Sequence, residues 1–431
     1  MIVGIDLGTT NCAVGVWRDG RPELIPNSLG HRLTPSAVSV DEDGAILVGL
    51  PARERQTTHP QNTATAFKRY MGSTRRTRLG KHEFLPEDLS ALVLQRLKGD
   101  AEAFLGEPVT EAVITVPAYF NDKQRKATRR AGELAGLKVE RLLNEPTAAA
   151  LAYGIHELAD ESRFLVFDLG GGTFDVSVLE IFEGVIEVRA STGDNRLGGE
   201  DFNEVLVDGF VRLPGVAFAE RDRQDPVLRE RLREAAEKAR RALTDEPAVT
   251  MSLTWRDETV AAEVTSEMFE TWAEPLVQRL REPVLRALRD SQLRADQLQE
   301  VVLVGGATRM PLVRRTATRM FGRFPAHAVH PDEAVAMGAA VQAGLKARDA
   351  ALKEVVLTDV CPYSLGTESV ERGPTGAFRE PVFVPIIERN TIIPASRVSS
   401  FVNAQDNQRQ VDLRIFQGSR AGRPTTSCWA A

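Results

Sequence analysis

Two stretches of this chain repeat one plan: a strand, a glycine–threonine turn and a second strand. They read "GIDLGTTNC" at residues 4–12 and "FLVFDLGGGTFDVSVLEI" at residues 164–181. In each stretch the first apolar run ends at an aspartate, Asp6 or Asp168. Because a strand and not a helix follows each turn, neither is a Walker A loop or a dinucleotide-binding fingerprint. The duplication predicts two similar lobes that face each other across a cleft.

The residue types of the two turns suit an anion. Glycines let backbone N–H groups approach a phosphate closely, threonine hydroxyls add donors, and a carboxylate at the strand end suits Mg²⁺. Glycine and threonine are also common wherever strands reverse direction. The spacing alone therefore fits a phosphate site and a pair of ordinary hairpins equally well.

Strands and helices alternate along the chain to about residue 345, which predicts an α/β core. Buried strands are expected at "AVITVP" (112–117) and "VVLVGG" (301–306). A helix follows each of them. Asn121 or Asp122 caps the first helix, and Pro311 lies near the first turn of the second.

Residues 226–244 form the clearest amphipathic helix. Its apolar stripe consists of Leu228, Leu232, Ala235, Ala239 and Leu243. The opposite face carries Glu237, Arg240, Arg241 and Thr244. Pattern alone favours a solvated role for that face.

Composition excludes several classes of protein. The net charge of −6 over 431 residues argues against nucleic acid or an anionic membrane as the main partner. The three cysteines are too far apart for a zinc site and suit a reducing compartment. No apolar run approaches the ~18 residues of a membrane span. No signal peptide precedes the strand that begins at Ile2, so a cytoplasmic location is expected. His327 and His330 are expected to be loop residues, not metal ligands.

The pattern changes after residue 351. Strand-like runs follow one another without a helix between them, at "REPVFVPII", "SRVSSFVNAQ" and "QVDLRIFQG". The final "SRAGRPTTSCWAA" has neither periodicity nor strand propensity. Residues 362–431, called the β-segment below, are few for an independent core.

Several long motifs occur together and in order: "VPAYFNDKQRKAT", "LLNEPTAAALAYG", "FDLGGGTFDVS", "GDNRLGGEDFN", "VLVGGATRMP" and "HPDEAVAMGAAVQAG". With them, the chain resembles the seventy-kilodalton heat-shock chaperone family, the DnaK-like proteins, from residue 1 to about 418. "LIPNSLG" and "LTDVCPYSLGTE" look closest to the short HscC-type branch.

The resemblance implies an actin-like, two-lobed ATPase domain, with a duplicated mixed sheet and helices, at residues 1–353. Lobe I would comprise about 1–157 and 331–353, and lobe II about 158–330. An interdomain linker at 354–361 would follow, then an incomplete β-sandwich segment at 362–431. Thr358 interrupts the run of leucines usual in such linkers, so weaker docking is expected.

The resemblance also implies the catalytic residues. Asp6 and Asp168 would hold Mg²⁺ through water, and Asp168 would also handle protons. Lys68 would reach the γ-phosphate, and Glu145 would lie near the attacking water. Thr173 at the γ-phosphate and Asp175 complete the set. Without this resemblance, nothing in the local sequence distinguishes Lys68 from an exposed lysine on a helix.

The expected cofactors are ATP or ADP and Mg²⁺, with K⁺ as a further possibility. The phosphates would be lined by Gly8, Thr9, Thr10, Asn11, Gly170, Gly171, Gly172, Thr173, Gly198 and Gly199. The adenosine would be held by Glu237, Arg240, Arg241, Thr244, Gly305, Gly306, Arg309 and Asp332. Arginine at 240 and threonine at 244 replace the commoner lysine and serine but keep the charge and the hydroxyl.

Such an ATPase would work with a J-domain co-chaperone and with unfolded or extended apolar peptides. Pro117 and the basic helix after it would relay the nucleotide state to the linker. The segment 250–268 is shorter than in DnaK, which puts a nucleotide-exchange factor in doubt. The chain is expected to end by a frameshift or gene-model error, so client binding would be weak and the ATPase module would dominate. A small-molecule kinase and a filament-forming nucleotide-binding protein on the same scaffold are the alternatives.

Overall fold

The computed structural model describes residues 1–157, 162–182, 185–326, 330–349, 352, 356–370, 381–403, 407–411, 413–418 and 428–430. Residues 158–161, where the first boundary of lobe II was predicted, lie outside this part of the chain, as does His327. So do residues 354 and 355 of the linker and most of the final segment.

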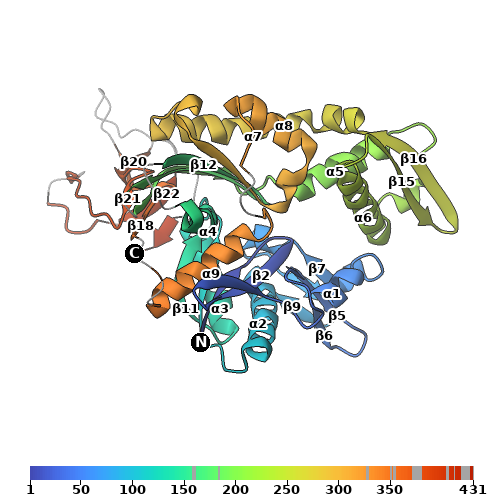
Figure 1. Cartoon of the computed structure of the whole chain (residues 1–431), viewed down its shortest axis with the longest axis horizontal. Helices are drawn as coiled ribbons and strands as arrows, with labels where there is room; N and C mark the ends of the chain where they lie inside the picture. The colour runs from blue at the N-terminus through green and yellow to red at the C-terminus, as the bar shows by residue number, and fades with distance from the viewer. Residues whose placement is uncertain are drawn as a thin grey trace.

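The first sheet grows from the first hairpin and is the core of lobe I (Figure 1). β1 and β2 are antiparallel, β3 continues the meander beyond β2, and β10 and β11 add in parallel on the other side. The turn after Asp6 leads directly into β2, as predicted. The bounds are β1 Ile2–Asp6, β2 Asn11–Arg18, β3 Arg21–Ile25, β4 Thr34–Pro35 (paired with β2), β10 Glu111–Val116 and β11 Lys138–Asn144.

The second sheet repeats this order and is the core of lobe II. β12, β13 and β14 form the antiparallel meander, and β17 adds to β12 in parallel. The place of a fifth strand is taken by a single parallel bridge between Val302 and Ala326. The sheet then continues beyond β14 through β18 and β21. The bounds are β12 Ser162–Leu169, β13 Phe174–Phe182, β14 Val185–Asp194, β17 Glu300–Val304, β18 Val356–Val360 and β21 Ile392–Ile393.

Helices α4 (Glu145–Glu157) and α9 (Ala334–Ala347) lie against each other between the two sheets (Figure 1). α9 packs on β1 and β2 of lobe I, whereas α4 contacts β12 and β13 of lobe II. The two helices together thus connect the two sheets. The duplicated mixed sheets and crossed helices form an actin-like, two-lobed α/β fold.

Helix α3 (Asp122–Leu134) begins where the sequence predicts. Asn121 is its cap, and its side chain accepts a hydrogen bond from the Gln124 N–H at 3.0 Å. Helix α6 (Pro226–Ala242) buries Leu228, Leu232 and Ala239 as predicted. Ala235 is only half-buried, since Ala236 occupies the centre of the apolar stripe.

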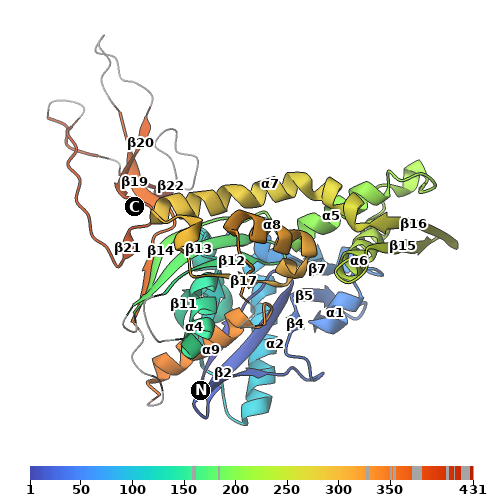
Figure 2. The same cartoon turned by 45° about the horizontal axis from the view of Figure 1, so that its top comes forward.

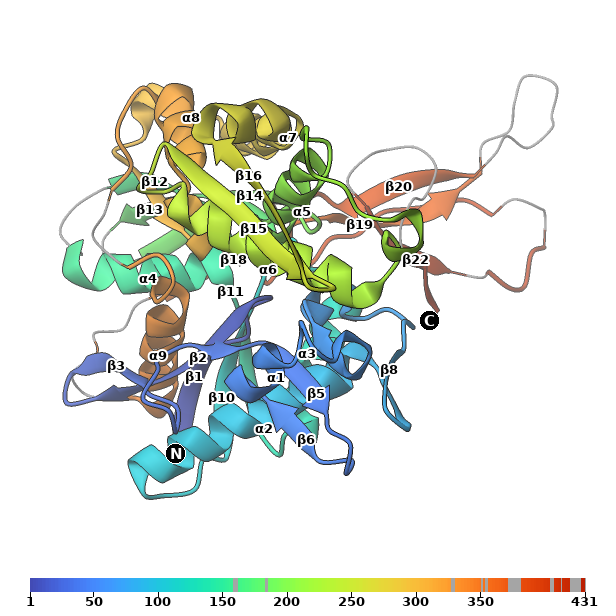
Figure 3. The same ribbon diagram turned by 90° about the vertical axis from the view of Figure 1, so that its right-hand side faces the viewer.

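Each lobe carries further elements around its sheet, and in Figure 3 α6 of lobe II lies opposite α1 and β5 of lobe I. On lobe I they are β5 Ala37–Val40, β6 Ile46–Val48, β7 Thr63–Thr65, β8 Thr77–Leu79, β9 His82–Phe84, α1 Leu50–Glu54, α2 Pro86–Leu105, η1 Pro60–Asn62 and η2 Phe67–Tyr70. On lobe II they are α5 Gly199–Phe210, α7 Ser266–Ser291, α8 Pro311–Phe321, β15 Ala248–Trp255, β16 Glu258–Thr265, η3 Glu220–Asp222, η4 Ala295–Gln297 and η5 Gly306–Arg309.

The β-segment projects beside the end of α7 (Figure 2). Its sheet has the order β20–β19–β22–β23, with β19 Ser364–Ser369, β20 Val382–Ile387, β22 Arg414–Gly418 and β23 Cys428–Ala430. The strand expected at 396–405 is wrong for its described residues, 396–403, whose side chains find little to pack on. The tail predicted to be without structure ends in β23, because β22 offers a free edge with which it pairs.

Candidate functional site

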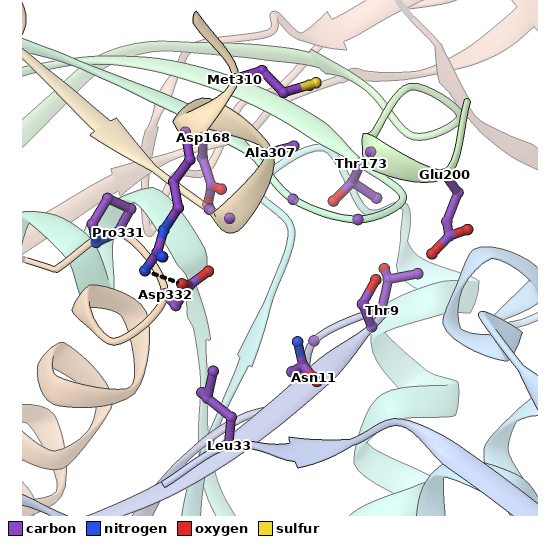
Figure 4. A pocket seen from close by; sticks show the side chains of 18 of the residues that line it. Thr9, Asn11, Leu33, Asp168, Thr173, Glu200, Ala307, Met310, Pro331 and Asp332 are labelled. Atoms are coloured by element: carbon purple, nitrogen blue, oxygen red, sulfur yellow. Dashed lines mark ion pairs between the residues drawn. The ribbon is translucent and has the colours of Figure 1, made fainter. Parts of the chain in front are cut away.

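The two turns face each other across a cleft between the lobes. In Figure 4, Thr9 of the first turn and Thr173 of the second point into the same pocket. Its volume is about 560 Å³, within the usual range for small-molecule sites. The turns approach so closely that a Cβ on Gly171 would lie 1.8 Å from the Thr10 hydroxyl oxygen. Glycine is therefore required at position 171.

The floor of the pocket holds three carboxylates and one lysine. Lys68, on η2, is buried and its Nζ lies 2.6 Å from Glu145 Oε1 at the start of α4. Asp6, at the end of β1, accepts a hydrogen bond from Thr115 Oγ1 at 2.9 Å. Asp168 lies opposite, near the end of β12. The charges of this floor are concentrated where little water can screen them.

Burial and mutual repulsion disfavour the charged forms of these acids. Burial, followed by the charge of Glu145, raises the pKa of Asp6 to about 7. The same two causes raise the pKa of Asp175 to about 7. Asp175 lies on β13, where it pairs with Asp168 of β12. They also raise the pKa of Asp168 well above its ordinary value. Burial opposes the charge of Lys68, but the neighbouring carboxylates raise its pKa overall.

This cluster suits a hard divalent cation. Carboxylate oxygens are the ligands that Mg²⁺ prefers, and the Asp175 Oδ2 atom is buried without a hydrogen-bond partner among the described residues. Mg²⁺ commonly keeps several waters. In the part of the chain that the structure describes, no three acidic, histidine or cysteine side chains are placed to ligate a metal directly. Asp6 and Asp168 therefore fit a magnesium ion held through its water shell.

The other end of the pocket is lined by α6 and η5. Glu237 lies in an ion pair of 2.5 Å with Arg53 of lobe I, and Arg240 donates to Asn203 Oδ1 at 2.8 Å. Burial disfavours the charged form of Glu237, but the charges of Arg53 and Arg241 outweigh this effect. The pKa of Glu237 is therefore lowered overall. This face of α6 thus faces a cleft. The purely solvated role favoured by its pattern is wrong.

Arg309 and Asp332 form an ion pair of 2.5 Å opposite that helix, marked by the dashed line in Figure 4. The backbone N–H of Gly305 donates to Pro331 O at 3.0 Å, which joins the loop before η5 to the loop before α9. A planar group could lie between this ion pair and α6. The arrangement leaves guanidinium faces and a hydroxyl, Thr244, for an adenosine-like ligand.

Most of the predicted site residues line this one pocket. They are Asp6, Gly8, Thr9, Thr10, Asn11, Lys68, Glu145, Asp168, Gly170, Gly171, Thr173, Gly199, Glu237, Arg240, Arg241, Thr244, Gly305, Gly306, Arg309 and Asp332. Gly172, Gly198 and Asp175 lie just behind the lining. Gly198 packs on Gly172, and Asp175 pairs across the hairpin with Asp168.

The pocket also contains residues that the sequence did not single out: Leu33, Glu200, Asp245, Ala307, Met310, Pro331 and Val335. Glu200, Ala307, Met310, Pro331 and Val335 fall inside the quoted motifs and could have been found there. Leu33 comes from a loop with no such signal, and the fold alone brings it to the pocket.

The described residues contain no helix long and apolar enough to span a membrane.

A family model described as Hsp70 protein matches residues 2–79 and 73–428, nearly the whole chain. The match covers both turns, the pocket floor, the α6 face and most of the β-segment. The chain therefore belongs to the Hsp70 family.

Proposed function

We propose that this protein is an ATP-dependent molecular chaperone of the DnaK/HscC type, which couples the hydrolysis of Mg-ATP to the binding and release of unfolded polypeptide. Hsp70 family members are ATP-hydrolysing chaperones. The observation that carries the proposal for this chain is the buried Lys68–Glu145 pair beside Asp6, directly below the two turns. "LIPNSLG" and "LTDVCPYSLGTE" support the HscC-type branch.

The turns would hold the triphosphate. Backbone N–H groups and the hydroxyls of Thr9, Thr10 and Thr173 would donate to its oxygens, and Lys68 would neutralise charge at the γ-phosphate. Mg²⁺, held through water by Asp6 and Asp168, supplies further charge neutralisation when it is bound. Phosphoryl transfer to water depends mainly on positioning and electrostatics.

A carboxylate has to orient the attacking water in line with the γ-phosphate. Glu145 is the best placed, because its partner Lys68 fixes it on the floor of the pocket. Asp168 and Asp175, with raised pKa values, can accept the proton that this water releases. K⁺ could be held by the same carboxylate oxygens, and adenosine would lie between Arg240 and Arg309.

The linker would transmit the nucleotide state to the β-segment, with the nucleotide-binding domain at 1–353 and the linker at 354–361. Its strand β18 extends the sheet of lobe II, pairing Val185 with Val356. Asn144, the residue before Glu145, donates to Asp359 Oδ2 at 2.6 Å. A change at Glu145 can therefore reach the linker over two residues.

The β-segment would bind extended apolar peptide. Val398 and Val402 are almost fully exposed, and Val411 is 69% exposed. Such exposed apolar side chains suit an extended apolar partner. A J-domain co-chaperone would stimulate hydrolysis, the need for an exchange factor is left to experiment, and we propose a cytoplasmic location.

The test is single-turnover hydrolysis of Mg-ATP by the purified chain, with and without an extended apolar peptide. Phosphate release that the peptide accelerates is the expected result. Phosphate release at the same rate with and without the peptide would contradict coupling to clients but would still support ATP hydrolysis. Transfer of phosphate to a sugar or carboxylate from a panel would replace the proposal with a kinase, and the absence of hydrolysis would contradict it entirely.

A further inference from the structure

The backbone of Tyr119, between β10 and α3, joins three parts of the molecule. Its N–H donates to Asp175 Oδ1 in lobe II at 3.1 Å. Its carbonyl accepts two hydrogen bonds, from Asn195 Nδ2 of lobe II at 2.8 Å and from the Tyr363 hydroxyl at 2.8 Å. Tyr363 belongs to the β-segment, so one residue of lobe I is held by both other parts.

The two tyrosine rings also pack against each other. Their centroids are 4.4 Å apart and their planes are inclined by 35°. Burial raises the pKa of Tyr363, which keeps its hydroxyl protonated and able to donate. The packing extends to the carboxylate. A Cβ on Gly193 would lie 2.9 Å from Asp175 Oδ1 and 3.3 Å from Tyr119 Cβ, so no larger residue fits between them.

Asp175 depends on this backbone. Within the described part of the chain, the N–H of Tyr119 is the one hydrogen-bond donor to its side chain, and its Oδ2 has no partner. The Tyr119 N–H lies in one peptide plane with the Ala118 carbonyl, which accepts a hydrogen bond from Arg125 Nη2 at 2.9 Å. The carbonyl that Asn195 and Tyr363 hold lies in the next peptide plane, and the two planes meet at the Tyr119 Cα. A shift of that carbonyl therefore reaches the N–H that orients Asp175 through the Cα of Tyr119.

We propose that Tyr363 is a positioning residue for the hydrolysis of ATP: from outside both lobes, its hydroxyl fixes the Tyr119 backbone and so orients Asp175 just behind the pocket lining. The inference rests on the proposed ATPase function and adds a residue to it. Small errors of position cost phosphoryl transfer much of its rate, because positioning supplies most of the catalysis. The effect should appear in the catalytic step and not in nucleotide affinity, since Tyr363 does not reach the pocket.

Tyr363→Phe tests the hydroxyl while it keeps the stacked ring. Loss of one such hydrogen bond predicts a fall of about fivefold in kcat for ATP, with KM for ATP unchanged within about twofold. Asn195→Ala removes the other donor to the same carbonyl and should lower kcat as well. Because both act on one acceptor, the double variant should differ from the product of the two single effects.

Two controls separate positioning from docking. Tyr70→Phe changes an exposed tyrosine, 41% accessible, and should leave kcat unchanged. Arg389→Ala removes the 2.7 Å ion pair with Asp290 that also holds the β-segment, but leaves the Tyr119 carbonyl alone. An unchanged kcat in Tyr363→Phe, or an equal fall in Arg389→Ala, would overturn the inference. A wild-type protein that hydrolyses no ATP would overturn the proposed function and this inference with it.

Discussion

The two lobes share a strand order but divide the work of the pocket unequally. Lobe I contributes Asp6, Glu145 and the one lysine of the floor. Lobe II contributes Asp168 and Asp175, and the cations that favour the charged form of Asp175, Lys68 and Arg125, both come from lobe I. When the two halves meet, the carboxylates of lobe II thus come to depend on cations of lobe I.

The sheets differ at their edges as well. β3 ends the first sheet on its meander side, whereas β14 in the second is continued by β18 and β21. An open edge is a place where a further strand can pair. In lobe II this edge receives β18. Lobe I therefore supplies Lys68, and the sheet of lobe II pairs with β18, the strand that leads to the β-segment.

Lys68→Met removes the cation on which the floor depends and should have the largest effect. We expect turnover of ATP to fall by about a hundredfold or more, since a charged donor to the transferring phosphoryl group is lost. Removing one partner of a buried pair also predicts a loss of about 3–5 kcal/mol in unfolding free energy, measured in urea without nucleotide. Lys81→Met, in an exposed turn, is the control and should change neither quantity. Full activity of Lys68→Met would contradict the conclusion that the site depends on the lysine of lobe I.

The floor acids should make the stability of the nucleotide-free protein fall as pH rises. Asp6 and Asp175 have pKa values of about 7 against an ordinary 3.8, so the folded state binds their protons more tightly than the unfolded state. Their contribution is present at low pH and is lost as pH passes through 7. We expect a decrease of about 5 kcal/mol between pH 5 and pH 8, about half of it from each acid. Urea unfolding at several pH values measures it.

The same urea unfolding in the presence of Mg-ADP is the comparison for that experiment. A bound cation relieves the repulsion among the carboxylates, so the dependence on pH should flatten. A slope of opposite sign without nucleotide would contradict the assignment of raised pKa values to the floor.

Asp175→Asn and Glu145→Gln should act in opposite directions on stability. The first removes a like charge from lobe II and should stabilise the nucleotide-free protein at pH 8 by about 2 kcal/mol, while turnover falls at least about tenfold. The second leaves Lys68 without its partner and should destabilise the protein. Equal effects of the two variants on the urea midpoint would show that the lobes do not divide the charges in this way.

Thr358→Val should have the smallest effect and tests the lobe II edge. The Thr358 hydroxyl is buried without a partner among the described residues, and valine has the same shape without the polar atom. We expect docking of β18 to become more favourable by about 1 kcal/mol, seen as slower amide hydrogen exchange over Val356–Val360. Thr391→Val, at an exposed hydroxyl near β21, is a comparison that should not slow this exchange. Faster exchange in Thr358→Val would be the contrary result.

The features that the residues alone predicted are local in sequence. The turns, the Asn121 cap and the burial of Leu228 and Leu232 follow from residues within a few positions of each other, where periodicity and turn chemistry decide. The α6 face shows the limit. Arg240 and Glu237 look solvated until lobe I, with Arg53, lies opposite them.

Other features depended on partners far along the chain. The strand Cys428–Ala430 exists because the edge of β22 is free, and nothing in its own sequence indicates it. Leu33 enters the pocket through a loop, and Tyr363 meets Tyr119 across 244 positions. Single-residue patterns carry no information on such distances.

The sequence by itself determined the duplicated hairpins and the α/β alternation, since these depend on local conformation. Only the tertiary structure decided that the three floor acids share one lysine, that Val356–Val360 form a strand of the lobe II sheet and that Tyr363 reaches the backbone beside Asp175. The reason is physical: burial and charge coupling depend on which surfaces meet, and those meetings are made by the whole fold.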